Sequence, residues 1–144
     1  MEKSNTDQPS TKILVMNPET DMEQLDILQL TSCQDNAFDR TNKFKLPDEK
    51  ESVYVYKIYN KIYGYVVFNI HDDLLWLGEL SAVEHDIGVS LLEFVIDYAK
   101  TNNIYRIASN VNQENPMAVS MYEFVGFKKK FNYASRCMEI KIEK

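Results

Sequence analysis

Cysteines and long apolar runs are scarce in this sequence, and each shortage excludes a class of protein. Cys33 and Cys137 are the two cysteines among 144 residues, and their spacing matches no metal-binding or redox motif. We therefore expect reduced thiols in a cytoplasmic protein with no metal site. No apolar run approaches the roughly 20 residues of a membrane helix, and the first residues lack the apolar stretch of a secretory signal. Neither a membrane partner nor a signal peptide is expected.

Basic residues are outnumbered by acidic ones. The chain has 16 Lys and Arg against 22 Asp and Glu, which gives a formal net charge of −6. Such a chain has little attraction for a phosphate backbone, so nucleic acid is not an expected partner, and cationic or neutral partners are mildly favoured. The 44% of hydrophobic residues is ordinary for a globular protein and is enough for a core.

The periodicity of apolar residues predicts one domain built from strands and helices. Residues 1–11 are polar and aperiodic, which indicates a flexible N-terminal tail, and residues 12–144 form the domain. The polar stretch from Cys33 to Glu51 predicts a short helix or a substrate-side flap. Strands are predicted at Lys12–Met16, Ser52–Tyr59, Ile62–Ile70, Leu74–Val83, Ile104–Val111, Phe127–Phe131 and Ser135–Ile142, with helices after Thr20, from Ile87 and from Pro116.

The order of these elements predicts an α/β fold with a mixed sheet. A helix lies between the strands Leu74–Val83 and Ile104–Val111, and a helical crossover implies that the two strands pair in parallel. The other strands follow one another through short turns and are expected to be antiparallel. Helices should therefore cover the faces of a mostly antiparallel sheet.

The most specific local motif is Asn115-x-x-Ala118-x-x-x-Tyr122-x-x-x-Gly126-Phe127, at the start of the last predicted helix. It resembles the signature of the GNAT N-acetyltransferase superfamily, and the resemblance extends over roughly Ser52 to Ile142. The alternative is structural: asparagine caps a helix, alanine and tyrosine pack, and glycine ends it. Five positions in the right topological place favour the family interpretation.

The resemblance implies a GNAT fold with six to seven strands and about four helices, and it implies binding of acetyl-coenzyme A. In such families the tyrosine protonates the departing thiolate, which makes Tyr122 the candidate acid, with a purely packing role as the alternative. Asn115 and Ala118 of the same motif are expected to line the cofactor site.

The strand that ends at Ala82 resembles the family strand whose backbone pairs with the pantetheine arm, so Leu80 and Ala82 are candidate cofactor contacts. Gly78 is expected at a bulge or a close approach of the backbone. Glu79 is the carboxylate within this strand. It is a candidate general base, and an outward-facing surface glutamate is an equal alternative.

The phosphate loop departs from the family pattern. Gly88 with the following Leu91-Leu92 matches its end, and Ile87, Gly88 and Val89 are expected to contact the pyrophosphate at the helix N-terminus. Asp86, however, stands where the first glycine is usual, Glu84 adds a second acid, and the loop is shortened. Both carboxylates oppose a bound anion unless they turn away.

The resemblance implies an acyl-coenzyme A-dependent N-acetyltransferase that acts on a primary amine of a small molecule or peptide. Neither nucleic acid nor a membrane is expected as a partner, and a homodimer stays open. The alternative is a GNAT-fold module that lost catalysis and binds a ligand or protein. A sheet-based RNA binder ranks third, because the chain is acidic and has no basic-aromatic strand stripe.

Overall fold

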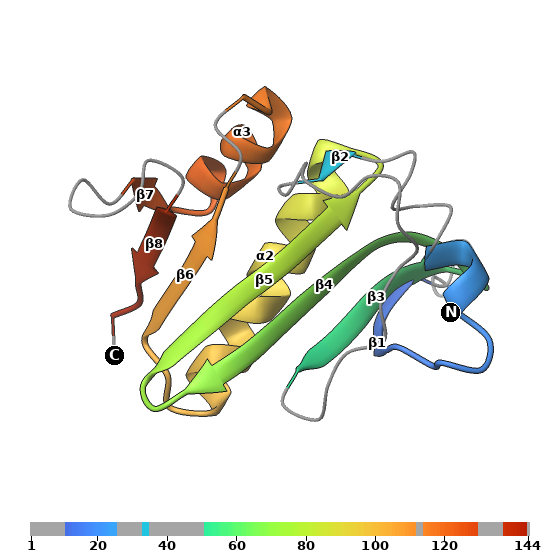
Figure 1. Cartoon of the computed structure of the whole chain (residues 1–144), viewed down its shortest axis with the longest axis horizontal. Coiled ribbons are helices and arrows are strands. Elements are labelled where there is room, and N and C mark those ends of the chain that lie inside the picture. The colour runs from blue at the N-terminus through green and yellow to red at the C-terminus, as the bar shows by residue number, and fades with distance from the viewer. Residues whose placement is uncertain (1–10, 26–32, 35–50, 112–113, 130–136, 144) are drawn as a thin grey trace, which may run out of the picture.

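The computed structural model describes residues 11–25, 33–34, 51–111, 114–129 and 137–143. Their strands form one mixed sheet in the order β1-β3-β4-β5-β6-β8-β7, with β2 paired to β5 as well (Figure 1). The strands are β1 (Thr11–Val15), β2 (Cys33–Gln34), β3 (Ser52–Ile58), β4 (Lys61–His71), β5 (Leu74–Ala82), β6 (Arg106–Asn110), β7 (Lys128–Lys129) and β8 (Cys137–Lys141), and the helices are α2 (His85–Thr101) and α3 (Pro116–Phe124).

The predicted fold class is confirmed. β5 and β6 pair in parallel across α2, and the other strand pairs are antiparallel. The expected number of helices was too high, since the described part of the chain holds α2, α3 and a helical turn at residues 22–25. Residues 1–10, the predicted tail, lie outside the described residues, as do 35–50 of the predicted flap.

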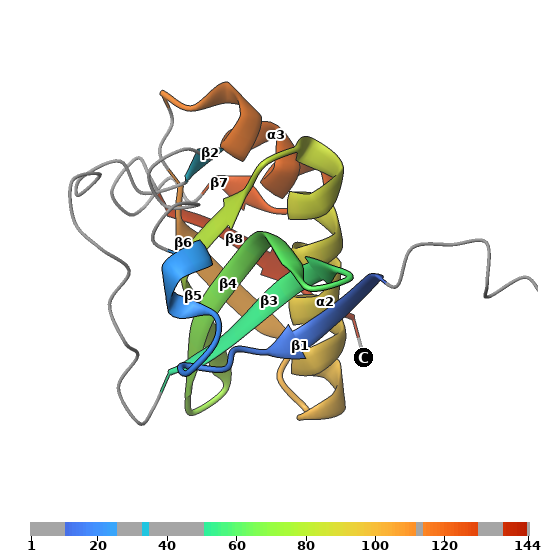
Figure 2. The ribbon, with the colours of Figure 1, turned by 90° about the vertical axis from the view of Figure 1, so that its right-hand side faces the viewer.

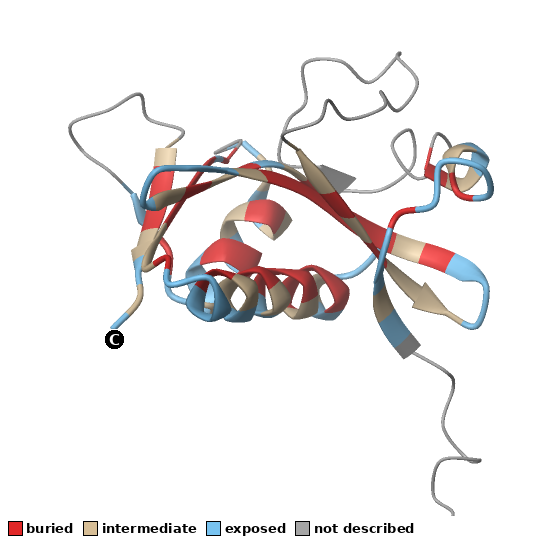
Figure 3. Ribbon diagram, turned by 90° about the horizontal axis from the view of Figure 1, so that it is seen from below, coloured by how far each residue is buried: buried red, intermediate tan, exposed pale blue. Residues whose placement is uncertain are grey.

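Two apolar clusters cover the two faces of the sheet. α2 and α3 pack on one face, and the helical turn of residues 22–25 lies on the other (Figures 2 and 3). The first cluster contains Leu91, Leu92 and Val95 of α2 and the second contains Leu25, all fully buried. Because side chains alternate along a strand, each residue of the central strands belongs to one face. We call the face that α2 and α3 cover the helix face and the opposite face the open face.

A buried ion pair holds the helical turn to the sheet. The Asp21 carboxylate is 1% exposed, accepts the backbone N–H of Asn17 at 2.9 Å and lies 3.0 Å from Lys57 Nζ on β3. Burial alone would raise the pKa of Asp21, but the Asn17 hydrogen bond and the Lys57 ammonium outweigh it and hold the pKa below its ordinary value.

The predicted ends of α3 are confirmed. Asn115 is the N-cap and its side chain accepts the Ala118 N–H at 3.2 Å, while Pro116 occupies the first turn. Gly126 follows the helix with φ of 111°, a conformation that favours glycine. The helix α2 begins at His85, two residues before the predicted start, so only two residues separate it from β5.

Candidate active site

The strands β5 and β6 separate in the middle of the sheet. Their parallel pairing runs from Leu74–Arg106 to Leu77–Ser109, after which β5 continues for five residues to Ala82. β4 pairs with the opposite edge of β5 as far as Ala82. The edge of β5 that faces β6 therefore has no β6 partner beyond Leu77, and we call this separation of the two strands the split.

A bulge at Gly78 marks the start of this edge. In the β4–β5 ladder Phe68 pairs with Leu77 and Val67 pairs with Glu79, so Gly78 is the extra residue. The predicted bulge is thus confirmed. A Cβ at Gly78 would have Val67 O as its nearest neighbour among the described residues, at 3.7 Å, so none of these residues requires glycine there by close approach.

Glu79 lies on the open face and has a partner there. The fully buried Tyr65 donates its hydroxyl proton to Glu79 Oε2 from β4. Glu79 is partly buried and is not the solvated surface glutamate of the alternative interpretation. Its carboxylate is held in place at the start of the split.

Tyr122 approaches the split from the helix face. Its side chain is fully buried, and its ring packs edge-on against Phe127 at 5.1 Å between centroids. Its hydroxyl lies 3.3 Å from Ser109 Oγ, and Ser109 donates to the Leu77 carbonyl at 2.9 Å. The two candidate catalytic residues thus flank the split from opposite faces of β5.

The N-terminus of α2 lies two residues after the end of β5. Glu84 is the N-cap residue and its side chain makes no capping hydrogen bond. The first backbone N–H groups of a helix have no partner within it, which applies to His85, Asp86 and Ile87. The Asp86 side chain is 101% exposed and His85 Nε2 lies 3.0 Å from Ser120 Oγ of α3. Asp86 can therefore point away from an anion bound at this terminus.

The structure gives several predicted cofactor contacts a packing role. The side chains of Leu80, Ala82, Ile87, Val89 and Ala118 are buried in the helix-face core, so only their backbone groups can reach a ligand. Gly88 is buried against α3, where a Cβ would lie 2.0 Å from Met121 Sδ. Its N–H donates to Glu84 O at 3.2 Å, and the Asn115 side chain caps α3.

The strand β2 was not predicted and lies on the split edge. Cys33 pairs with Ala82 and Gln34 with Ser81, and since β4 occupies the other edge of both residues, β2 takes the edge that faces β6. β2 contacts both β5 and α3, and Figure 1 shows it near the end of β5. No sequence signal marked it, because two residues are too short for a periodic pattern.

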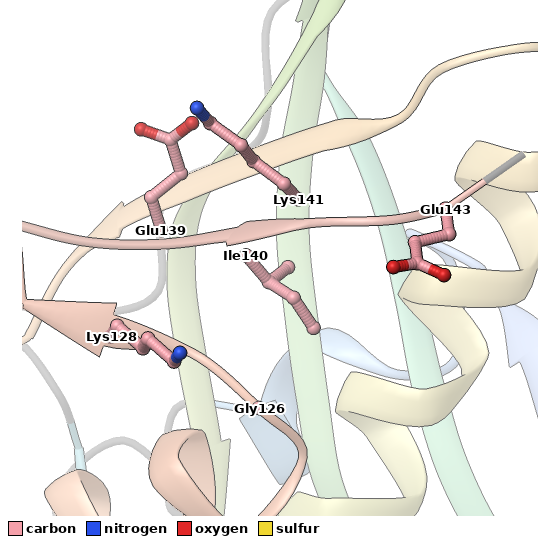
Figure 4. A pocket seen from close by; sticks show the side chains of 6 residues that line it. All are labelled: Gly126, Lys128, Glu139, Ile140, Lys141 and Glu143. Carbon is pink, nitrogen blue, oxygen red and sulfur yellow. The ribbon is translucent and has the colours of Figure 1, made fainter.

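Two hollows open beside β8. A cavity of about 310 Å³ on the open face is lined by Trp76, Arg106, Asn110 and Glu139, with Leu74, Ala108 and Cys137. Arg106 Nε donates to Glu139 Oε2 at 3.1 Å inside it. A second hollow, of about 560 Å³, is lined by Gly126, Lys128, Ile140 and Glu143, with Glu139 and Lys141 (Figure 4). The first lies on the same face as Glu79, while the second lies at the β7–β8 edge.

Neither a metal cluster nor a membrane span is found in the described parts of the chain. No group of three or more His, Cys, Asp or Glu residues is arranged there to hold a metal ion. No helix of those residues is long and apolar enough to cross a membrane.

Comparisons with known proteins agree with the fold. The model of the acetyltransferase (GNAT) family matches residues 19–127, while no curated protein sequence matches. Similar structures include the ribosomal-protein-S18-alanine N-acetyltransferase of Escherichia coli, with 16% identity, 93% of this chain and 95% of that chain covered, and a TM-score of 0.73. PaiA N-acetyltransferase of Thermoplasma acidophilum, in complex with coenzyme A, has 18% identity, coverages of 92% and 99%, and a TM-score of 0.71. Aminoglycoside 6'-acetyltransferase type Ii has 14% identity, with 92% of this chain and 98% of that chain covered, and a TM-score of 0.69.

Proposed function

Because the chain belongs to the acetyltransferase (GNAT) family, we propose that it transfers the acetyl group of acetyl-coenzyme A to a primary amine. The observation that carries the proposal is the position of Tyr122, whose hydroxyl lies next to the last β5–β6 pair before the strands separate. A phenol is protonated at neutral pH and can protonate a leaving thiolate. The PaiA structure, which contains coenzyme A, supports the choice of cosubstrate.

The described residues fit such a cosubstrate. The edge of β5 beyond Leu77 is the edge with which the amides of a pantetheine arm would pair, and at Ser81 and Ala82 the arm would take the place of β2. The first turn of α2 offers the N–H groups of His85, Asp86 and Ile87 to phosphate, at the positive end of the helix dipole. Gly88 and Val89 are less suited, because the Gly88 N–H is bonded within the helix. Acetyl-coenzyme A, when bound, supplies an activated thioester.

Three groups around the split have separate roles in the proposed reaction. The Gly78 N–H lies at the bulge, outside the β4 register, and is our candidate donor to a developing oxyanion. Glu79, on the open face, takes a proton from the acceptor ammonium directly or through water. Tyr122, on the helix face, holds a proton at Oη for the departing sulfur. The amine thus approaches from one face and the thiol leaves on the other side.

The acceptor belongs on the open face, beside Glu79. The cavity bounded by Trp76 and the Arg106–Glu139 pair lies on this face and has room for a small molecule or a peptide end. Similar structures are named as acetyltransferases of a protein alanine and of an aminoglycoside, so the fold is compatible with both classes of acceptor. The absence of a disulfide motif in the sequence supports a cytoplasmic location.

A second candidate function is a GNAT-fold module that binds a ligand or protein without catalysis. Two observations favour it: β2 pairs with Ser81 and Ala82, on the edge that the pantetheine arm would use, and Glu84 and Asp86 stand at the phosphate end. In that case the chain's own backbone replaces the cofactor on β5.

The two functions are separated by a titration followed by an assay. Calorimetry with acetyl-coenzyme A tests binding, and a panel of small amines and peptide N-termini is then assayed for thiol release. Binding together with amine-dependent thiol release supports the enzyme. No heat and no thermal shift at millimolar cofactor would reject it in favour of the module, and binding without thiol release would leave a ligand-binding module.

A further inference from the structure

Ser109 is a buried polar residue that the sequence motif did not single out. It is fully buried on β6, in the last residue pair before β5 and β6 separate. Its hydroxyl oxygen lies 2.9 Å from the Leu77 carbonyl oxygen and 3.3 Å from Tyr122 Oη. One hydroxyl group therefore joins both strands of the split to α3.

The directions of these hydrogen bonds follow from the protons available. A carbonyl oxygen can only accept, so Ser109 donates its single hydroxyl proton to Leu77. In the contact with Tyr122 the serine oxygen has only lone pairs left, so Tyr122 is the donor. Leu77 thus orients Ser109, and Ser109 in turn orients the O–H bond of Tyr122.

We infer that Ser109 is a positioning residue that sets the hydroxyl of Tyr122 for proton transfer, an inference that rests on the proposed function. Tyr122 passes one proton to the departing sulfur and becomes a phenolate. Ser109 can then turn its own proton from Leu77 to the phenolate oxygen, which stabilises the charge. The acceptor ammonium loses two protons on its way to the amide, one before and one after it attacks, and Glu79 takes them in turn, directly or through water. One proton returns through solvent to Tyr122 and the other is released to solvent, which balances the cycle.

A purely structural role is the competing explanation. The Ser109–Leu77 bond crosses from β6 to β5, and its loss alone would loosen the sheet at the split. Both explanations predict some loss of stability in Ser109→Ala. Only the positioning role predicts that Ser109→Ala changes the environment of the Tyr122 hydroxyl. It also predicts that the loss of rate depends on the presence of that hydroxyl.

Nuclear magnetic resonance tests the contact without cofactor or turnover. Labelling with ¹³C at Cζ gives a resonance for each of the nine tyrosines, and Tyr122→Phe identifies the one that belongs to Tyr122. We expect Ser109→Ala to shift this resonance, because Cζ carries the hydroxyl, and Ser109→Thr to keep it near the wild-type position. A Tyr122 resonance that does not move in a folded Ser109→Ala protein would overturn the inference.

Kinetics then tests the role. We expect Ser109→Ala to lower kcat by about 10- to 100-fold, the loss of one or two hydrogen bonds in the transition state, with the KM for acetyl-coenzyme A within about twofold. Ser109→Thr, which keeps the hydroxyl, should recover most of the rate. In a Tyr122→Phe background, Ser109→Ala should have little further effect, because the hydroxyl that it positions is gone.

Failure of the inference and failure of the proposed function give different results. An equal loss of rate from Ser109→Ala with and without the Tyr122 hydroxyl would overturn the positioning role while the acetyltransferase stands. A wild-type protein that releases no thiol with any amine would reject the proposed function, and with it a catalytic purpose for Ser109, even if the resonance shifts.

Discussion

The variant Gly88→Ala tests whether Gly88 is needed for phosphate binding or for the packing of α2 against α3. In an ordinary helix interior, alanine is favoured over glycine by about 1 kcal/mol. Here the added Cβ would lie 2.0 Å from Sδ and 3.0 Å from Cε of the fully buried Met121. Overpacking of a filled core costs about 1–3 kcal/mol. Because Met121 would have to change rotamer within the core, we expect the upper end of that range and a net loss of about 2 kcal/mol.

Urea unfolding monitored by circular dichroism measures this loss, and Gly88→Ala in a Met121→Val background provides the matched control. Shortening residue 121 to valine removes Sδ and Cε, the two atoms nearest to the new Cβ, so the alanine should cost less there than in the wild-type protein. Acetyl-coenzyme A affinity, measured where each variant is folded, should change little. A Gly88→Ala protein as stable as wild type would refute the close packing of α2 on α3, and lost affinity at unchanged stability would favour the phosphate role.

Three further predictions concern other parts of the molecule. Tyr122→Phe should lower the rate by roughly 10²–10⁴-fold in a steady-state assay with similar cofactor affinity, and full activity would remove Tyr122 from the mechanism. Asp86→Asn should tighten acetyl-coenzyme A binding about threefold in low-salt calorimetry, because one negative charge leaves the phosphate end, and unchanged affinity would mean that Asp86 does not face the phosphates. Asp21→Asn should cost about 2–3 kcal/mol of unfolding free energy at pH 7, since it breaks the partly screened pair with Lys57. The folded-state pKa of Asp21 is lowered, so its contribution is complete above the unfolded pKa near about 4. It is lost as the pH falls through the lower folded value, and a difference in urea midpoint between the two proteins that stays the same on acidification would contradict it.

The fold was predictable because each of its main elements leaves a periodic pattern in the sequence. The alternating apolar residues of β3, β4 and β5 give the meander, and the helical crossover gives the parallel pair. Asn115 and Gly126 mark the ends of α3 because capping and left-handed backbone require particular residue types. The motif also led to Tyr122, which the structure places beside the last β5–β6 pair, while its role in proton transfer stays a prediction.

The rest of the site depends on contacts between residues distant in sequence. Tyr65 and Glu79 meet only because the bulge at Gly78 sets the register of β5 against β4. A single serine in a strand, such as Ser109, carries no pattern that would distinguish it from any other. The assignment of Gly88 to phosphate followed a motif, whereas its packing against Met121 depends on how closely α2 and α3 approach.

If acetyl-coenzyme A pairs with β5 as proposed, the short strand β2 makes its binding an exchange of one β5 partner for another. Ser81 and Ala82 have one set of backbone groups on that edge, and β2 already pairs with them. A ligand that takes the same edge binds only the molecules from which β2 has detached, so its apparent dissociation constant is the intrinsic value divided by the detached fraction. With about one molecule in a hundred detached, a site of about 1 μM intrinsic affinity would behave as one of about 100 μM. The cofactor concentration at which the protein becomes occupied is then set partly by how firmly residues 33–34 hold to β5.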